Sequence, residues 1–394
     1  MKDPHTSTHT SQPAANTQQK RRKQPKKKRS LATNVVLSVI LVLLLLFLAG
    51  FLFITSKLRL INYNDGLPKT VNGLREDDLD DEGDNLDLDM TGLELVEPNA
   101  IPEIDTKVVD SVLNVLLLGT DDRTLEFSDN ARADSIILLS LNFEDNSAKL
   151  VSLERGMGVP ILDGEYKGQY DWITHCFRYG GADLMMKEVQ ECFKIEVNHY
   201  VRVNLNALIK VVDAIGGIDV ELTDTEAWYL NQSAVYGSNF GIYASGNIYQ
   251  GDGTSEIRND LKAGVNHLSG AMAVGYARLR AIDSDWQRIA RQRAVIQAIA
   301  NQLKSADLMT LNKLCDEVLP LVQTNFTQND ILNLMMKAPG FLGVTFDQMT
   351  IPAQGTFGGM TGMEGRGMFW PDWETNIQLL HEFLYGEQKP ETAD

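Results

Sequence analysis

The sequence lacks the short motifs of the common nucleotide-binding and hydrolytic sites. Its 394 residues contain no Walker A loop, no G-x-G-x-x-G, no G-x-S-x-G and no H-E-x-x-H. The six histidines show no metal-ligand spacing, and the three cysteines form no zinc pattern with them. The chemistry of this chain therefore has to come from other side chains.

Positive charge is scarce beyond the N-terminal tail. The net charge is −17, yet residues 1–30 hold nine basic residues and one acid. The acidic balance of the remainder argues against a nucleic-acid partner. The tail is rich in Ser, Thr, Gln and Pro, which indicates a disordered segment.

Charge is absent altogether from Val35–Ile54, a stretch long enough to cross a bilayer as a helix. The basic cluster before it outweighs Lys57 and Arg59 after it, so we expect the N-terminus in the cytoplasm. We predict a cytoplasmic tail at 1–30, a single transmembrane helix at 31–55, and a main domain on the outer side of the cell membrane. A cleaved signal peptide is the alternative.

An extracytoplasmic location affects how two further features are interpreted. Residues 56–110 carry the run REDDLDDEGDNLDLD with proline and glycine, which predicts an acidic linker. Cys176 and Cys192 could form a disulfide bond there, and buried free thiols are the alternative.

Three apolar runs predict a meander of buried strands at Val112–Gly119, Ser135–Leu141 and Lys149–Leu153. In a meander, the end of the first strand, the start of the second and the end of the third share one edge. Charged residues gather at that edge: Asp121, Arg123, Arg132, Asp134 and Arg155. In α/β proteins, ligand-binding sites commonly form from polar side chains at the ends of buried apolar strands.

Alternating strand and helix patterns predict an α/β domain at 111–305, with a central mixed sheet flanked by helices. Residues 226–260 and 355–368 show no periodicity and are interpreted as exposed loops. Residues 306–394 are predicted to be a C-terminal extension packed on this domain.

The stretch Tyr276–Gln292, YARLRAIDSDWQRIARQ, concentrates arginines near a predicted helix start. Arg278 and Arg280, two positions apart, would leave an extended segment on the same face. A capping box at Ser284–Gln287 starts a helix, which presents three polar side chains on one face: Arg288, Arg291 and Gln292. Clustered guanidiniums suit a poly-oxygen anion such as pyrophosphate, and a basic surface strip paired with carboxylates is the alternative.

Two carboxylates, Asp121 and Asp134, are predicted beside these arginines. Paired aspartates suit Mg²⁺, which shares its remaining coordination positions with water and phosphate oxygens. Ion pairing between aspartate and arginine without a metal is the alternative. A site with a metal and arginines in the extracytoplasmic domain of a membrane-anchored protein points to a phosphorylated substrate at the membrane, such as a lipid-linked pyrophosphate.

Seven segments in order over residues 112–303 resemble the LytR–CpsA–Psr family of bacterial cell-wall proteins. They are LLLGTDDR, ARADSI, SLERG, HCFRYGG, VDAIGGIDVEL, LKAGVNHLSGAMAVGYARLR and SDWQRIARQR. The anchor after a basic tail also fits that family, and the resemblance implies a Gram-positive type of envelope.

The resemblance implies an α/β/α fold with a pocket for a polyprenyl chain. It also implies Mg²⁺-assisted transfer of a glycan polymer, with phosphate, from polyprenyl-pyrophosphate to a peptidoglycan hydroxyl, with hydrolysis of the pyrophosphate as a side activity. By motif, Asp121 and Asp134 would hold Mg²⁺ and act in catalysis together with Arg155, Arg278 and Arg280. The residues implied to bind pyrophosphate are Arg132, Arg155, Arg278, Arg280, Arg288 and Gln292.

One motif departs from the family pattern. The family triplet Pro-Arg-Asp is replaced by Glu154-Arg155-Gly156, which keeps the arginine and loses the aspartate. A non-catalytic polyprenyl-phosphate-binding regulator of the envelope is therefore the alternative function. The polymer, the acceptor and the oligomeric state are left open by the sequence.

Overall fold

The computed structural model describes residues 48–67, 88, 90–120, 122, 127–128, 131–236, 260–279, 282, 285–341 and 344–386. The chain divides into two compact units, Met1–Phe53 and Ile54–Asp394. Of the first unit, residues 48–53 are described, and they are helical. Within the described ranges, no helix is both long and apolar enough to cross a bilayer. Most of the predicted transmembrane segment, the basic tail and the acidic run lie outside these ranges.

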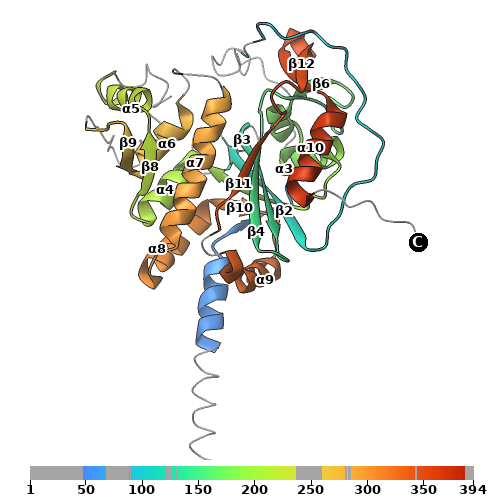
Figure 1. Cartoon of the computed structure of the whole chain (residues 1–394). Coiled ribbons are helices and arrows are strands. Elements are labelled where there is room, and N and C mark those ends of the chain that lie inside the picture. The colour runs from blue at the N-terminus through green and yellow to red at the C-terminus, as the bar shows by residue number, and fades with distance from the viewer. Residues whose placement is uncertain are drawn as a thin grey trace, which may run out of the picture. The chain divides into compact units, whose positions relative to one another are not determined.

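The second unit, Ile54–Asp394, is built on a seven-stranded mixed sheet (Figure 1). The strands in spatial order are β1 (Asn62–Tyr63), β10 (Val322–Thr324), β7 (His199–Asn204), β2 (Val112–Thr120), β3 (Ala133–Asn142), β4 (Ser147–Leu153) and β11 (Asp347–Ile351). Strands β2, β3 and β4 are antiparallel neighbours, so the predicted meander is confirmed. Strand β7 runs parallel to β2, and β11 runs parallel to β4.

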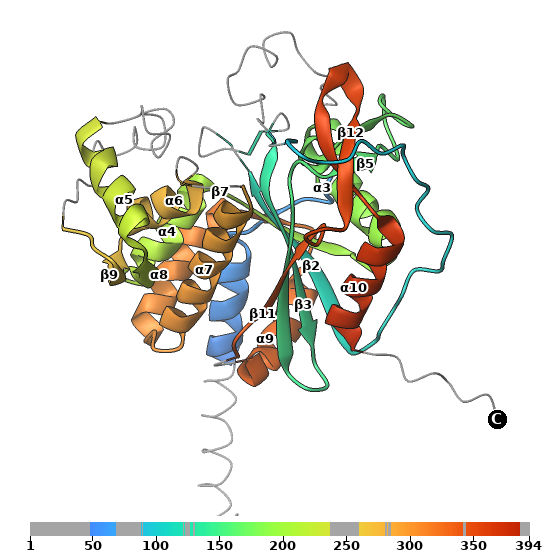
Figure 2. The same cartoon turned by 45° about the horizontal axis from the view of Figure 1, so that its top comes forward.

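Helices cover both faces of this sheet (Figure 2). One face carries α4 (Leu205–Ala214), α6 (Gly270–Arg278) and α7 (Asp285–Leu303), and beyond them α5 (Asp224–Tyr236), α8 (Leu308–Val318) and the hairpin β8 (Ile218–Leu222)–β9 (Gly264–Leu268). The other face carries α3 (Ile173–Phe193) and α10 (Trp373–Tyr385). Two small hairpins lie beside α3: β5 (Gly158–Pro160)–β6 (Tyr170–Trp172) and β12 (Phe357–Thr361)–β13 (Gly367–Pro371). Helix α9 (Gln328–Lys337) follows β10. The α/β fold with a mixed central sheet flanked by helices is confirmed.

Alternation along the central strands divides the interior into two layers. In β2, Leu116 and Leu118 are buried in the core that includes α3 and α10. Leu117, between them, lines the opposite face of the sheet. Because successive strand residues point to opposite faces, a strand that is apolar throughout supplies both layers.

Two sequence interpretations change, and the alternative left open for the two cysteines is resolved. Residues 226–236 belong to helix α5 and not to a loop, and residues 237–259 lie outside the described part. The apolar stripe of α5 is short, because Ala227 and Leu230 are buried while Trp228 is half exposed. The stretch 355–368 contains strand β12 and the turn into β13. Cys176 and Cys192 are buried free thiols, so the disulfide is absent.

Candidate active site

A cavity of about 310 Å³ lies between the sheet and helices α4, α6 and α7. Its walls are mainly apolar and include Leu117, Ile137, Val201, Leu208, Val274 and Ile296. Its polar lining residues include Asp134 from β3, Arg278 from α6, and Arg288 and Gln292 from α7. All four were predicted as site residues. A cavity with greasy walls and a cationic section suits an amphiphile with an anionic head group.

Asp134 is placed by an irregularity in the β2–β3 ladder. Gly119 pairs with Ser135, whereas Thr120 pairs with Ala133, so Asp134 is the extra residue of a β-bulge. Such bulges reorient a side chain at the end of a strand pair. The Asp134 carboxylate lines the cavity and accepts a hydrogen bond of 3.0 Å from Nη1 of Arg155. The predicted meeting of Asp134 and Arg155 at one sheet edge is confirmed.

The arginine stretch reaches the cavity from two helices. Arg278 is the last residue of α6, so the extended conformation predicted for it is wrong. Ser269 caps the start of α6 by accepting a hydrogen bond from the Met272 amide, and the helix runs on to Arg278. A cation in the last turn also complements the helix dipole. Arg288 and Gln292 lie one turn apart on α7 and share the cavity-facing side, as predicted.

Arg291 does not join this group. Its Nη1 donates to Glu226 over 3.3 Å, and its Nη2 donates to the Leu279 carbonyl over 2.7 Å. The side chain is buried and ties α7 to α5 and to the end of α6. Of the three polar residues predicted on one face of this helix, Arg291 has a structural role, whereas Arg288 and Gln292 line the cavity.

Several predicted residues cannot be placed. Asp121, Arg123, Arg280 and the capping Ser284 lie outside the described residues. Arg132 is described and buried, two positions before Asp134 in the segment that enters β3.

The carboxylate next to Asp121 has a structural role that the sequence did not reveal. Asp122 is buried, and both of its oxygens lie 2.9 Å from Nη2 of Arg202 in β7. Asp122 also accepts from the Thr120 hydroxyl and the Ser128 amide. The network ties Asp122 and Ser128 to strand β7. Nothing local in the sequence marks Asp122, because its partner comes 80 residues later.

Of the two predicted magnesium ligands, Asp134 lies within the described residues. Its side chain is 31% exposed and lies on the cavity wall beside Arg278 and Arg288, so one hard oxygen ligand faces the space where phosphates would bind. Among the described residues, no group of three or more His, Cys, Asp or Glu side chains could hold a metal. Mg²⁺ keeps several waters and phosphate oxygens, so one or two protein carboxylates suffice, and Asp134 fits that requirement.

The altered triplet Glu154-Arg155-Gly156 is tightly enclosed. Glu154 is buried, and its Oε1 accepts a hydrogen bond of 3.3 Å from the Gly156 amide. A Cβ atom on Gly156 would lie 2.7 Å from the Leu88 side chain. A side chain at position 156 would therefore require the end of the Leu88 side chain to move.

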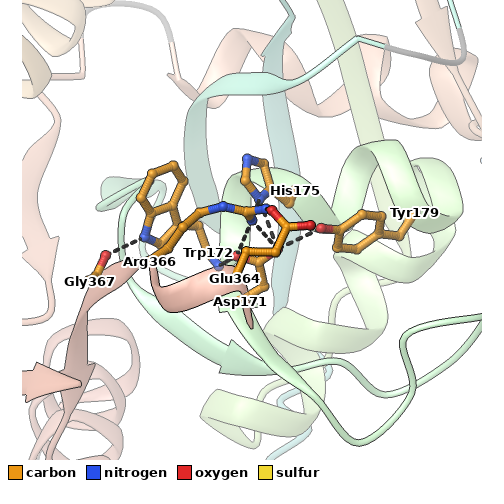
Figure 3. A network of polar contacts seen from close by, with 7 residues as sticks. All are labelled: Asp171, Trp172, His175, Tyr179, Glu364, Arg366 and Gly367. Atoms are coloured by element: carbon orange, nitrogen blue, oxygen red, sulfur yellow. Dashed lines mark hydrogen bonds and ion pairs between the residues drawn. The ribbon is translucent and has the colours of Figure 1, made fainter. Parts of the chain in front are cut away.

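A second polar cluster surrounds Asp171, which is fully buried (Figure 3). His175 Nδ1 lies 2.9 Å from Asp171, the Tyr179 hydroxyl donates to it over 2.5 Å, and Arg366 Nη1 lies 3.0 Å from both carboxylate oxygens. Glu364 pairs with Arg366 from the other side. His175 and Tyr179 are four residues apart on α3, whereas Asp171 lies in β6 and Arg366 comes 195 residues after Asp171, so no local pattern in the sequence marks the cluster.

The electrostatics of this cluster favour an ionised aspartate. Burial alone raises the pKa of Asp171, but the hydrogen bond and charge of His175, together with Arg366 and Tyr179, bring the pKa down to about 2. Burial lowers the pKa of His175 against the opposing effect of Asp171. Burial beside the same carboxylate raises the pKa of Tyr179. Asp171 is thus charged and fully hydrogen-bonded, which is typical of a structural anchor.

With this geometry, the molecule is an α/β protein with a lipid-sized cavity and a cluster of arginines on its wall. The sequence model of the LytR_cpsA_psr family matches residues 90–372, and the chain belongs to that family. The resemblance seen in the sequence motifs is confirmed.

Curated relatives are similar over much of the chain. The polyisoprenyl-teichoic acid–peptidoglycan teichoic acid transferase TagU of Bacillus mycoides is 29% identical over 248 residues, which cover 62% of this chain and 69% of the relative. The protein of the same description from Bacillus cereus is 30% identical with the same coverage.

Solved structures share the fold. TagT bound to LI-WTA is 25% identical with a TM-score of 0.52, and the match covers 72% of this chain and 93% of TagT. A Streptococcus agalactiae protein, gbs0355, is 20% identical with a TM-score of 0.56, over 72% of this chain and 91% of the other.

Proposed function

We propose that the protein transfers a glycan polymer, with one phosphate, from a polyprenyl-pyrophosphate carrier to a hydroxyl of peptidoglycan. The relatives named above are described as teichoic acid transferases, and a glycopolymer of that kind is the cargo we propose. The carrier is a membrane lipid, which agrees with the proposed transmembrane segment and an extracytoplasmic domain.

One observation carries the proposal: the apolar cavity has Arg278, Arg288 and Gln292 on its wall. An isoprene chain is apolar, and its burial in the cavity would stabilise the complex by about 25 cal/mol for each Å² of apolar surface removed from water. The diphosphate at its end would meet the guanidiniums, which bind phosphate oxygens in pairs.

The proposed reaction is a phosphoryl transfer in which these side chains hold the diphosphate and stabilise the leaving group. The acceptor hydroxyl oxygen bonds to the phosphorus that carries the glycan, and the bond from that phosphorus to the bridging oxygen breaks. Polyprenyl phosphate leaves with the bond's electrons, and the hydroxyl proton ends in solvent or on the leaving phosphate. Arg278 and Arg288 orient the diphosphate and stabilise the charge that grows on the leaving group. Arg155 lies 3.0 Å from Asp134, which lines the cavity, and we propose that it contacts the same phosphates from the sheet edge.

We also propose Mg²⁺ as the cofactor, held by Asp134 with Asp121. The ion would neutralise phosphate oxygens and leave the protein side chains to fix the geometry. If water takes the place of the glycan acceptor, the same site hydrolyses the pyrophosphate, and we propose this as a side activity.

The alternative is an envelope regulator that binds polyprenyl phosphate without turnover. The buried Glu154 and the Leu88 contact at Gly156 favour it, since a carboxylate at position 156 beside Arg155 would have to displace the Leu88 side chain. Tight lipid binding with no product would distinguish this function.

The transfer assay uses the full chain in detergent micelles, a short-chain polyprenyl-pyrophosphate glycan, Mg²⁺ and peptidoglycan fragments. We expect a phosphate-linked product by mass spectrometry, and a rate at least tenfold lower for Arg278→Ala. Lys187→Met, which removes an exposed cation of α3, is the matched control. The enzyme proposal fails if no product forms, or if Arg278→Ala and the control behave alike.

A further inference from the structure

The hairpin β12–β13 contacts the segment that carries Arg155. The amide of Phe369 in β13 donates to the Gly156 carbonyl over 3.1 Å, and Met157 forms a bridge with Phe369. A Cβ on Gly158 would lie 2.4 Å from the Met368 sulfur, so β13 and the start of β5 touch without a gap. The backbone on the C-terminal side of Arg155 is therefore shaped by a hairpin more than 200 residues later.

The start of α3 holds the same turn from the other side. The Thr174 amide approaches the Arg155 carbonyl at 3.4 Å, and the Ile173 amide donates to the Met157 carbonyl over 2.8 Å. The Thr174 hydroxyl donates to the Ala133 carbonyl over 2.8 Å, next to Asp134. Helix α3 thus touches the backbone beside both partners of the Asp134–Arg155 pair.

The hairpin and the start of α3 are joined by two side-chain links (Figure 3). Arg366, in the turn of the hairpin, reaches both oxygens of buried Asp171 at 3.0 Å. Trp172 Nε1 donates to the Gly367 carbonyl over 2.7 Å. The Arg366 guanidinium also lies 5.8 Å from the Trp172 ring centre. The β12–β13 hairpin and the start of α3, which both contact the backbone around Arg155, are therefore connected to each other by Arg366 and Trp172.

We propose that Arg366 is a positioning residue for the active site: by locking the hairpin to the start of α3, it holds the Arg155 turn in the geometry that binds pyrophosphate. The inference rests on the proposed function, since it assumes that Arg155 meets the phosphates. It assigns a role to the hairpin, whose glycine- and methionine-rich sequence showed no purpose.

The test compares two probes on the full chain in detergent micelles: farnesyl pyrophosphate with Mg²⁺, and farnesol. Farnesol uses only the apolar cavity, whereas the pyrophosphate also needs the arginines. We expect Arg366→Met to weaken farnesyl pyrophosphate binding about tenfold by calorimetry and to leave farnesol binding unchanged. Arg366→Lys keeps the charge and loses the paired contact, so we expect it to recover part of the affinity.

Arg366→Met leaves Asp171 charged in the interior and can prevent folding. Two further variants address this. Asp171→Asn with Arg366→Met removes both charges, and Trp172→Phe removes the hydrogen bond to Gly367 while keeping an aromatic ring at this buried position. Both are expected to weaken pyrophosphate binding selectively, the second by about twofold to threefold.

The positioning role is overturned if these variants bind both probes as the unmodified protein does, or lose affinity for both probes equally. Arg278→Ala separates this failure from that of the proposed function. If Arg278→Ala weakens pyrophosphate binding and the hairpin variants do not, only the positioning role is lost. If Arg278→Ala has no effect either, the proposed function fails with it.

Discussion

Two aspartate–arginine pairs near the same end of the sheet differ in how deeply the carboxylate is buried. Asp122 is fully buried and accepts hydrogen bonds from Arg202, Thr120 and Ser128. Asp134 lies 3.0 Å from Arg155, and 31% of its side chain is exposed.

The difference separates structural from functional charge. A carboxylate surrounded by donors is fixed in place and has no oxygen left for a ligand. A carboxylate with an exposed edge on a cavity wall can exchange part of its shell for a metal or a substrate. The two residues look alike in the sequence, and burial and partners distinguish them.

The largest expected effect on stability comes from breaking the buried Asp122–Arg202 pair. Arg202→Met leaves Asp122 charged and buried, so we expect the free energy of unfolding to fall by about 3–5 kcal/mol in urea titrations. Adding Asp122→Asn removes the stranded charge and should restore most of that loss. Equal stability of Arg202→Met and the unmodified protein would contradict a structural role for this pair.

A third buried carboxylate sharpens the comparison. Burial raises the pKa of Glu188 to about 8, and its Oε2 has no hydrogen-bond partner within the described part of the chain. The folded pKa lies above the ordinary 4.5, so the stabilising contribution is present below pH 4.5 and is lost as pH rises through 8. From pH 5 to pH 9 we expect unfolding free energy to drop by roughly 2–4 kcal/mol.

Glu188→Gln keeps an oxygen for the Leu162 amide and cannot ionise. We expect its stability to be nearly flat over the same pH range. A decline as steep as that of the unmodified protein would assign the pH dependence to other groups.

Restoring an aspartate at position 156 tests whether the enclosed triplet can be reopened. Gly156→Asp places a side chain against Leu88, and overpacking of this kind costs about 1–3 kcal/mol. Leu88→Ala in the same chain makes room and should recover most of the stability. The packing explanation is wrong if the single variant is as stable as the double variant.

The smallest effect on stability is expected at the Asp134–Arg155 pair. Arg155 is buried, but Asp134 is 31% exposed and its charge stays hydrated when Arg155 is lost, so Arg155→Met should lower the free energy of unfolding by about 1–2 kcal/mol, less than Arg202→Met. The same substitution should weaken binding of farnesyl pyrophosphate about tenfold. Large destabilisation without a loss of binding would reverse the roles assigned to the two pairs.

Local patterns were sufficient for the meander and for the position of Asp134 and Arg155, because apolar runs and short turns fix which strand ends meet. They also placed Arg288 and Gln292 correctly, since helical spacing is local. Arg291 has the same spacing but is held by Glu226, a partner 65 residues away that no local pattern can identify.

The hairpin β12–β13 was missed for a related reason. Its glycines resemble a loop, yet a Cβ on Gly358 would lie 2.5 Å from Val96, and one on Gly359 would lie 2.9 Å from Met90. These glycines allow a distant segment to pack against the hairpin. Their purpose is a tertiary contact, which the chain around them does not encode.

We propose that the cavity holds the lipid carrier while the arginines on its wall hold the pyrophosphate. A crystal structure of the complex with farnesyl pyrophosphate and Mg²⁺ tests it most directly. We expect the isoprene chain between the sheet and α4, α6 and α7, with phosphate oxygens at hydrogen-bond distance from Arg278 and Arg288. A ligand bound elsewhere, or one whose phosphates avoid these two arginines, would contradict the account.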